Sequence, residues 1–452
     1  MRRPIITIAA VLAGIAASQG RIITVDDDGP ADFSAIQAAI DDANDGDTVL
    51  IADGRYTGAG NRDLDFHGKA ITVKSQNGPE HCIIDCNGTP SEPHRGFYFH
   101  SFERQDSVLS GLTVTNGYAV AGGGIYCDRG SPTIENCIIA RNQAEGAGGI
   151  CWVVDSSQEA ALSGCVVVDN RADYVGGIFV GTYGASLTVR NCLIAGNTAV
   201  YEGGGVGADT FDMLTFEACT FAHNAAELGG GLFCYEGDFV LRNCILWGNS
   251  AAIGPEIMIF DCHCAPPCTT LNIYYCDLQG GREGVHGYNC FEYGIFFREG
   301  NIDADPWFAD PNKGDYHLRS QAGRYDPNEG RWKIDEVTSP CIDAGDPMTP
   351  IGLEPFANGG RINMGAYGGT GEASKSYFGA APCETILAGD INGDCKVNFL
   401  DFRLVALHWL EDNRPCGIAT TRYVFQADPN ALTTSGGQGG VKEVSLSRAC
   451  SS

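Results

Sequence analysis

The chain has 452 residues, with 56 acidic and 29 basic side chains and a formal net charge of −27. A field of this sign repels phosphate backbones and anionic lipid headgroups, which excludes nucleic-acid and membrane-surface binding as leading functions. It suits calcium ions, neutral polymers and cationic partners.

The first twenty residues have the features of an export signal. Arg2 and Arg3 supply the positive start, residues 5–17 are apolar, and the small residues Ser18 and Gly20 offer a cleavage site. The apolar stretch is too short to span a bilayer. We therefore expect residues 1–20 to be a signal peptide and the protein to be extracellular or at the cell surface, with no membrane insertion after cleavage.

A short helix is expected next, over residues 32–43. Its apolar stripe at helical spacing comprises Phe33, Ile36, Ile40 and Ala43. Asp32 is a plausible N-cap for this helix, which would cover the first edge of a stacked sheet. Thr48 to Ile51 then predicts a strand. We interpret the acidic run at residues 26–28 as a solvated loop that leads into the helix rather than as a site.

An internal repeat organises the middle of the chain. A cysteine, three mostly apolar residues, a variable residue and an asparagine recur, and the asparagines are 25 to 28 residues apart. The copies end at Asn142, Asn170, Asn197, Asn224 and Asn249. Between them lie Gly-Gly pairs followed by an apolar residue, as in Gly176-Gly177-Ile178. Leu112 to Asn116 is similar to an earlier copy with Gly111 in the place of the cysteine.

Short apolar runs rich in β-branched residues and separated by Gly and Asn predict strands and turns. One turn of a parallel β-helix needs three short strands, and successive coils stack at ~4.8 Å. The fold class is therefore predicted to be all-β, a right-handed parallel β-helix over residues 21–380 with core repeats at about 108–255 and an N-terminal capping helix.

The repeated residues have physical roles in this fold. The Gly-Gly pairs allow positive φ and close backbone approach, and the asparagines are expected to adopt the left-handed conformation and to hydrogen-bond from coil to coil. The cysteines are inward-facing small apolar groups or, alternatively, disulfide partners in neighbouring coils. Arg190, Glu217 and Arg242 occupy one outward position, where opposite charges would stack.

The repeat becomes less regular after residue 255. Strand-like residues continue through Leu271 to Leu278. Pro, Asp and Gly become frequent from about residue 303, which predicts a loop-rich C-terminal closure that extends through Tyr377.

These residues carry a resemblance. The Gly-Gly-Ile blocks that alternate with segments such as Phe221 to Asn224 resemble the paired motifs of polymorphic outer-membrane-protein repeats. More broadly, residues 21–375 look like a secreted right-handed β-helix of the pectin-lyase-like kind. The stretches 68–75, 339–346 and 363–369 are similar to a group of such proteins from planctomycete-type bacteria. This resemblance implies the fold; the same architecture hosts lyases, hydrolases, adhesins and passive scaffolds.

A second, local resemblance lies near the C-terminus. Residues 390–401 resemble one calcium loop of a dockerin type I repeat, and a helix with an apolar face is expected to follow. The implied Ca²⁺ ligands are Asp390, Asn392, Asp394, the Lys396 carbonyl, Asn398 and Asp401. Cys395 replaces the glycine usual at the sixth loop position, and only one loop is found, whereas dockerins that bind cohesins usually carry two. We expect a calcium-binding module at residues 383–416, a cohesin-like protein as a partner only if one loop suffices, and a flexible tail at 417–452.

The search for catalytic residues gives one polar grouping within the repeat. The position before each repeat asparagine carries Arg141, Asp169 and, two coils further, His223. We favour a solvated bend over a catalytic site here. The sequence signatures of polygalacturonases, Gly-His-Gly and Arg-Ile-Lys, do not occur in the chain.

A cysteine-rich segment runs from Cys262 to Cys268, with Cys276 and Cys290 nearby. Cysteine and histidine together can bind zinc. In an exported protein, disulfides in an irregular loop are the favoured interpretation.

We expect the protein to bind or process extracellular polysaccharide. If the chain is an enzyme, we expect it to be a polysaccharide lyase or an O-glycosyl hydrolase. The alternative is a non-enzymatic cell-surface adhesin or structural scaffold. Several carboxylates on one face would favour catalysis. A smooth face of Thr, Asn and small residues would favour adhesion.

Overall fold

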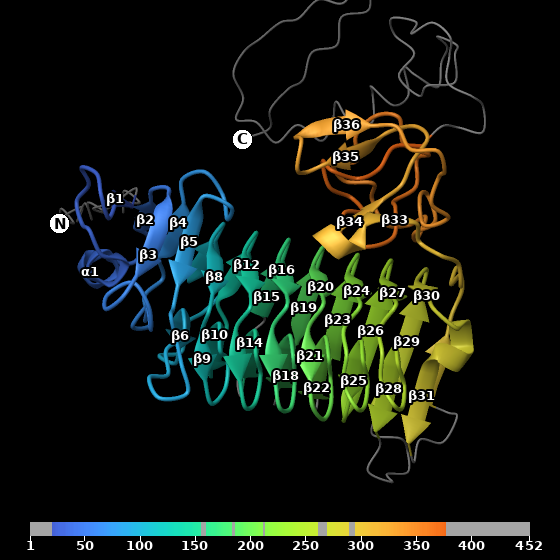
Figure 1. The fold of residues 1–452 in the computed structure, drawn as a ribbon, viewed down its shortest axis with the longest axis horizontal. Coiled ribbons are helices and arrows are strands. Elements are labelled where there is room, and N and C mark those ends of the chain that lie inside the picture. Colours follow the sequence, from blue (N-terminus) through green and yellow to red (C-terminus); the bar gives the residue numbers. More distant parts are fainter. Residues whose placement is uncertain are drawn as a thin grey trace, which may run out of the picture.

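Three long parallel sheets wind around one apolar interior in this protein (Figure 1). The structure, a computed structural model, describes residues 20–376 except 155–159, 183–185, 211–212, 261–268 and 289–293. From β4 to β31 each coil adds one strand to each of the three sheets, and the described part of the chain makes about nine turns. The predicted β-helix is confirmed.

The longest of the three sheets is named sheet A, and its described strands are all parallel. They are β1 (Ile22–Val25), β2 (Thr48–Ile51), β4 (Thr72–Ser75), β7 (Val108–Ser110), β11 (Thr133–Glu135), β15 (Ala160–Ser163), β19 (Leu187–Arg190), β23 (Met213–Glu217), β26 (Gly237–Arg242), β29 (Thr269–Tyr274) and β32 (Ile295–Phe297).

Sheet B follows sheet A in every coil. Its strands are β3 (Gly54–Thr57), β5 (Cys82–Asp85), β8 (Thr113–Thr115), β12 (Ile138–Ala140), β16 (Val166–Val168), β20 (Leu193–Ala195), β24 (Thr220–Ala222), β27 (Ile245–Trp247) and β30 (Asp277–Leu278). A short sheet D then turns the chain through β9 (Tyr118–Ala119), β13 (Gln143–Ala144), β17 (Arg171–Ala172) and β21 (Thr198–Ala199).

Sheet C completes each coil. Its strands are β6 (Phe97–Phe99), β10 (Ile125–Asp128), β14 (Ile150–Val154), β18 (Ile178–Thr182), β22 (Val206–Thr210), β25 (Leu232–Cys234), β28 (Ile257–Phe260) and β31 (Val285–Tyr288). A 3-10 turn, η1 (Gly281–Gly284), precedes β31. Alternate residues point inward, so Ile139, Val167, Ile194, Phe221 and Leu246 form one fully buried column across sheet B.

The repeat asparagines form a buried ladder. Asn170 donates from its backbone N–H and its side-chain Nδ2 to Asn197 Oδ1, both at 3.0 Å, and its Nδ2 also donates to the Ile139 carbonyl at 2.8 Å. The pattern repeats as far as Asn249, where the Glu256 carboxylate accepts hydrogen bonds from both the backbone N–H and the Nδ2 of Asn249. This ladder satisfies backbone groups at a bend that water does not reach.

Two expectations about backbone conformation were wrong. The left-handed residue is the one before each asparagine, as at Asp169 with φ of 56°. The Gly-Gly pairs are outside the positive-φ region, and they are required by close packing, since a Cβ at Gly177 would lie 2.4 Å from the Gly205 carbonyl oxygen. The early repeat copy is also shifted by one residue, because Ile138 pairs with Thr113 and so Leu112 takes the place of the cysteine.

The repeat cysteines point into the interior. All twelve cysteines in the described part of the chain are buried and free, among them Cys137, Cys165, Cys192, Cys219, Cys244 and Cys276. Each of these six thiols donates to a main-chain carbonyl, as Cys192 does to Arg190 at 3.2 Å. The inward-facing interpretation is therefore confirmed for these residues.

The N-terminal helix α1 (Ile36–Asp42) covers the first coil with its buried residues Ile36, Ala39 and Ile40. Ala35, not Asp32, is its N-cap. The Asp32 carboxylate instead accepts hydrogen bonds from the backbone and hydroxyl of Thr24. Ile36 and Ile40 of the expected stripe are buried as predicted, but the helix begins at Ile36 and Phe33 lies before it, bridged to Val25. The expected cap is wrong, because a strand neighbour competes for the same carboxylate.

The C-terminal residues form a lobe on the side of the β-helix rather than a closure of its end. The lobe contains β33 (Phe308–Asp310), η3 (Pro311–Lys313), β34 (Asp315–Leu318), β35 (Arg324–Asp326) and β36 (Arg331–Lys333). Its buried residues Phe308, Tyr316 and Met364 pack on Ala222 and Ile245 of sheet B. Within the described ranges, no helix is both long and apolar enough to cross a bilayer.

Candidate functional site

The outer faces of the three sheets differ in chemistry. Sheet A presents mainly Thr and charged side chains, with Thr188 and Thr215 in register and an ion pair of 2.5 Å between Arg190 and Glu217. Arg242 is next in this row, but it pairs with Asp346 of the lobe. Sheet A is thus a solvated face, and the expected charge stacking is only partly realised.

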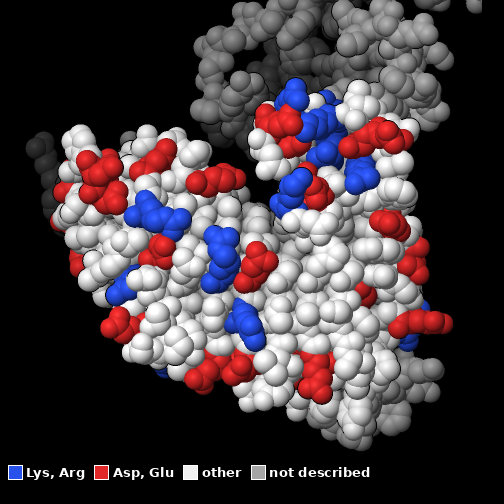
Figure 2. All heavy atoms as spheres, viewed as in Figure 1, with Lys and Arg blue, Asp and Glu red and all other residues white. Residues whose placement is uncertain are grey.

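The lobe covers part of the outer face of sheet B. Leu193, Ala195, Ala222 and Ile245 are buried beneath it. Figure 2 shows a hollow between the lobe and the N-terminal coils, above the coils that the lobe leaves uncovered.

Arg141 and Asp169 follow β12 and β16 in adjacent coils, and His223 lies two coils further, as the repeat predicts. All three are exposed. The Asp169 carboxylate lies against Gly196 of the next coil, and the His223 ring lies against Gly248. Among the described residues Arg141 and Asp169 form no ion pair. The side chains follow one edge without converging, which supports the interpretation as a solvated bend.

Sheet C is the aromatic face of the molecule. Its outward positions form two rows that run along the β-helix axis. One row contains Tyr98, Tyr126, Cys151, Phe179, Gly207, Phe233, Met258 and His286. The other contains Asp128, Val153, Gly181, Asp209, Tyr235, Phe260 and Tyr288.

Aromatic rings stack at both ends of this face. Tyr235, Phe260 and Tyr288 form a ladder with centroid separations of 5.2 and 5.3 Å and nearly parallel rings. At the other end Tyr98 stacks on Tyr126 at 5.3 Å. Because the rings cover one another, only the end faces of each stack and the ring edges meet solvent.

Arg95 adds a positive charge to the first stack. Its guanidinium carbon lies 4.9 and 5.1 Å from the ring centroids of Tyr98 and Tyr126. Burial lowers the pKa of Arg95, and one of its terminal nitrogens is buried without a hydrogen-bond partner among the described residues. This contact fixes the two rings in place.

The middle of the face carries unpaired carboxyl groups. Burial raises the pKa of Asp209, and the charge of Glu236 raises it further. Burial and the Asp209 charge raise the pKa of Glu202 in the same way. In the part of the chain that the structure describes, neither Glu202 nor Asp209 forms an ion pair or a side-chain hydrogen bond. Half-buried carboxyls without partners are unfavourable for stability, which marks them as candidates for ligand contact.

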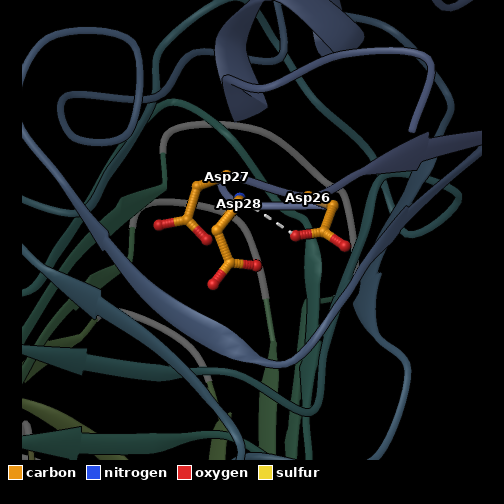
Figure 3. A group of neighbouring side chains, drawn as sticks. All are labelled: Asp26, Asp27 and Asp28. Carbon is orange, nitrogen blue, oxygen red and sulfur yellow. Dashed lines mark hydrogen bonds between the residues drawn. The ribbon is translucent and has the colours of Figure 1, made fainter. Parts of the chain in front are cut away.

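The acidic run near the N-terminus forms a tight turn (Figure 3). Its three carboxylates each have an oxygen within 4.8 Å of the others. Asp26 Oδ1 accepts the backbone N–H groups of Asp28 and Gly29 at 3.2 and 3.0 Å. These bonds account for the position of Asp26, whereas Asp27 and Asp28 are exposed. The assignment of the run as a solvated loop remains a prediction.

Other expected sites lie outside the described residues. These are the calcium loop at 390–401 and the cysteine segment at 262–268, together with Cys290. Cys276 is described, and it is a buried member of the cysteine column.

Comparisons with known proteins agree with this architecture. Residues 39–194 and 153–256 match the family model described as a right-handed β-helix region. The solenoid is a right-handed parallel β-helix. Residues 288–345 match a second family model, described as disaggregatase related. No protein with a curated description matches the chain.

Two solved structures resemble the right-handed β-helix. A pectate lyase, Pel9A, is 16% identical, with 77% of this chain and 96% of that chain covered and a TM-score of 0.41. A pectin methylesterase from carrot is 12% identical, with 64% and 89% covered and a TM-score of 0.36. Likenesses this weak support no function for this chain.

The sequence did not point to Glu202, Asp209 or the aromatic rows. The cysteine and asparagine columns dominate the repeat, whereas the outward positions of sheet C vary from coil to coil. Counting from each Gly-Gly pair would have found the aromatic rows and Asp209, because the second and fourth residues after the pair face outward, but it would not have found Glu202, which precedes its pair.

Proposed function

We propose that this chain is an exported protein that binds extracellular polysaccharide along the outer face of sheet C. The observation that carries this proposal is the pairing, on one extended face, of aromatic rings with half-buried carboxyls that have no protein partner among the described residues. Aromatic side chains pack against the apolar faces of sugar rings, and carboxylates accept hydrogen bonds from hydroxyl groups. The outer face of sheet A is a solvated surface, and the outer face of sheet B is partly covered by the lobe.

The length of the face suits a polymer. From Tyr98 to Tyr288 it crosses eight strands, and seven steps of ~4.8 Å give roughly 34 Å. A ligand with one or two sugars would leave most of this face unused. A polysaccharide that lies along the β-helix axis would contact both aromatic stacks.

Binding is tested with the purified full-length protein against neutral and acidic plant and algal polysaccharides, by affinity electrophoresis and calorimetry. Replacing Tyr235 and Tyr288 with alanine is expected to weaken binding about tenfold, since each lost ring contact is worth about 0.5–1.5 kcal/mol. Met213→Ala is the matched control, because Met213 is exposed on sheet A. The proposal fails if no polysaccharide binds, or if the sheet A variant weakens binding as much as the sheet C variant.

Hydrolysis is a second candidate, favoured by Glu202 and Asp209. Glycoside hydrolases use two carboxyls, one of which must be protonated, and a raised pKa supplies the protonated form near neutral pH. Release of reducing ends by the wild type, lost in both Glu202→Gln and Asp209→Asn, would support it. Binding without any release would leave a binding protein, as an adhesin or scaffold requires.

The calcium-binding module and its partner are also part of this proposal. The ligand pattern at residues 390–401 supports one Ca²⁺ ion, bound by carboxylate, amide and carbonyl oxygens. A protein with a cohesin-like surface is the partner that such a module would attach to.

A further inference from the structure

Two outward aromatic residues of sheet C, Phe179 and Phe233, have no ring partner among the described residues, and of these two only Phe179 is partly exposed, since Phe233 is buried. The Tyr and Phe rings at the two ends of the face cover one another. The neighbours of Phe179 in the adjacent coils are the small residues Cys151 and Gly207. Val175 occupies the space over Gly207, and Phe179 is partly exposed in the middle of the face with no ring stacked on it among the described residues.

Gly181 sets the position of this ring. Residues 179 and 181 point outward on the same strand, and a Cβ at Gly181 would lie 3.2 Å from Cε1 and 3.5 Å from Cζ of Phe179. The ring therefore leans along the strand into space that any other side chain would fill. Gly181 lies outside the positive-φ region, so its role is to leave room for the ring.

The two carboxyls belong to the coil next to this ring. Asp209 is the neighbour of Gly181 in that coil, so it adjoins the space into which the Phe179 ring leans. Glu202 lies in the turn before β22, where the charge of Asp209 raises the pKa of the Glu202 carboxyl. Asp209 is thus the carboxyl nearest to the Phe179 ring, and Glu202 is the second half-buried carboxyl, next to Asp209.

We propose that Phe179, Asp209 and Glu202 form a subsite for one uncharged pyranose ring, so that the protein prefers neutral polysaccharides to those built from uronic acids. The proposal rests on the polysaccharide binding proposed above. The C–H face of the sugar packs on the Phe179 ring, and its hydroxyl groups donate to the two carboxyls. A uronate at this position would bring a third negative charge beside Asp209 and Glu202, which is unfavourable.

The test compares affinities for a neutral galactomannan, hydroxyethyl cellulose and polygalacturonate at low and moderate salt. The wild type is expected to bind at least one neutral polymer at least tenfold more tightly than polygalacturonate. Phe179→Ala and Gly181→Val should each weaken neutral binding about tenfold, because one removes the ring and the other displaces it, whereas Phe179→Tyr should retain binding. Asp209→Asn should narrow the gap between neutral and acidic polymers.

Thermal unfolding of each variant identifies any that fail to fold, and Met213→Ala on sheet A serves as the control. Neutral binding that is unchanged in both Phe179→Ala and Gly181→Val would overturn this subsite and leave binding by sheet C standing. Preference for polygalacturonate would also overturn it. The absence of binding to all three polymers would overturn the subsite and the proposed function together.

Discussion

Asp277 and Cys341 meet where the C-terminal lobe joins the β-helix. The Cys341 thiol donates to Asp277 Oδ2 at 3.0 Å, and both side chains are fully buried. Asp277 also accepts the backbone N–H of Ala304 at 3.1 Å. Burial raises the pKa of Asp277 to about 7 and holds the pKa of Cys341 well above its ordinary value. The contact therefore combines a permanently protonated thiol with a carboxyl that titrates near neutral pH.

This contact predicts a pH-dependent stability. The pKa of Asp277 is about 7 in the folded chain and about 4 in the unfolded chain, so the unfolded state loses its proton first as the pH rises. The free energy of unfolding should fall between about pH 4 and pH 7, by at most about 4 kcal/mol from this group. Chemical denaturation at pH 5 and pH 8 should show a smaller difference for Asp277→Asn than for the wild type.

Burial also raises the pKa of Glu256 and of Glu354 to about 7. The free energy of unfolding of Asp277→Asn should therefore still fall with rising pH, but less steeply than that of the wild type. Asp310→Asn, on the exposed surface of the lobe, is the control and should keep the wild-type slope. An identical slope in Asp277→Asn and the wild type would show that this carboxyl does not titrate as described.

The asparagine ladder should be intolerant of truncation. Asn197→Ala leaves the Asn170 backbone N–H and the Val167 carbonyl without their partners inside the bend. We expect a loss of about 3 kcal/mol in the free energy of unfolding, since each orphaned buried group costs about 1–3 kcal/mol. Asn77→Ala removes an exposed side chain that donates a hydrogen bond to Asp53, and it should change the free energy of unfolding by less than about 0.5 kcal/mol. Equal effects of the two variants would contradict the account of the ladder.

The thiols of the cysteine column should not react with a thiol reagent in the folded protein. In the unfolded protein all of them should react as free thiols. A thiol reagent should label none of the repeat cysteines in the native protein, because they are buried and their environment is apolar. In denaturant without reductant, mass spectrometry should find Cys137, Cys165, Cys192, Cys219 and Cys244 all labelled. Cross-linked peptides that join two of these cysteines would instead establish disulfides between coils.

The calcium module should bind metal independently of the polysaccharide face. Calorimetry is expected to show one Ca²⁺ site that is lost in Asp390→Ala, because the first loop position contributes a carboxylate ligand. Asp45→Ala, which removes an acidic side chain in the N-terminal region, is the control and should bind Ca²⁺ as the wild type does. If Asp390→Ala gave the same calorimetric Ca²⁺-binding signal as the wild type, the ion would not be bound by the loop at residues 390–401.

The β-helix could be predicted because its interior repeats in sequence. Val167, Ile194 and Phe221 lie one coil apart in sequence and directly over one another in the structure. The backbone conformations could not be predicted, since either residue of an Arg141-Asn142 or Asp169-Asn170 pair can adopt positive φ, and packing decides between them. Likewise, Asp32 could cap a helix or bind Thr24, and sequence alone does not rank the two.

The functional face was harder to predict for a physical reason. Outward residues are free to vary as long as the strand still pairs, so Phe179, Gly207 and Phe233 occupy one row without a common character. The position of the lobe also depends on contacts far apart in sequence, such as the two hydrogen bonds that Asn191 donates to the carbonyls of Ala366 and Gly368. Its packing against sheet B leaves sheet C as the open aromatic face.

The most direct test of the role of sheet C is a crystal structure of the full-length protein with a neutral oligosaccharide of six or more sugars. The account predicts density for sugar rings along sheet C between Tyr126 and Tyr235, with one ring packed on Phe179. Density confined to sheet A, or to the hollow between the lobe and the N-terminal coils, would contradict it.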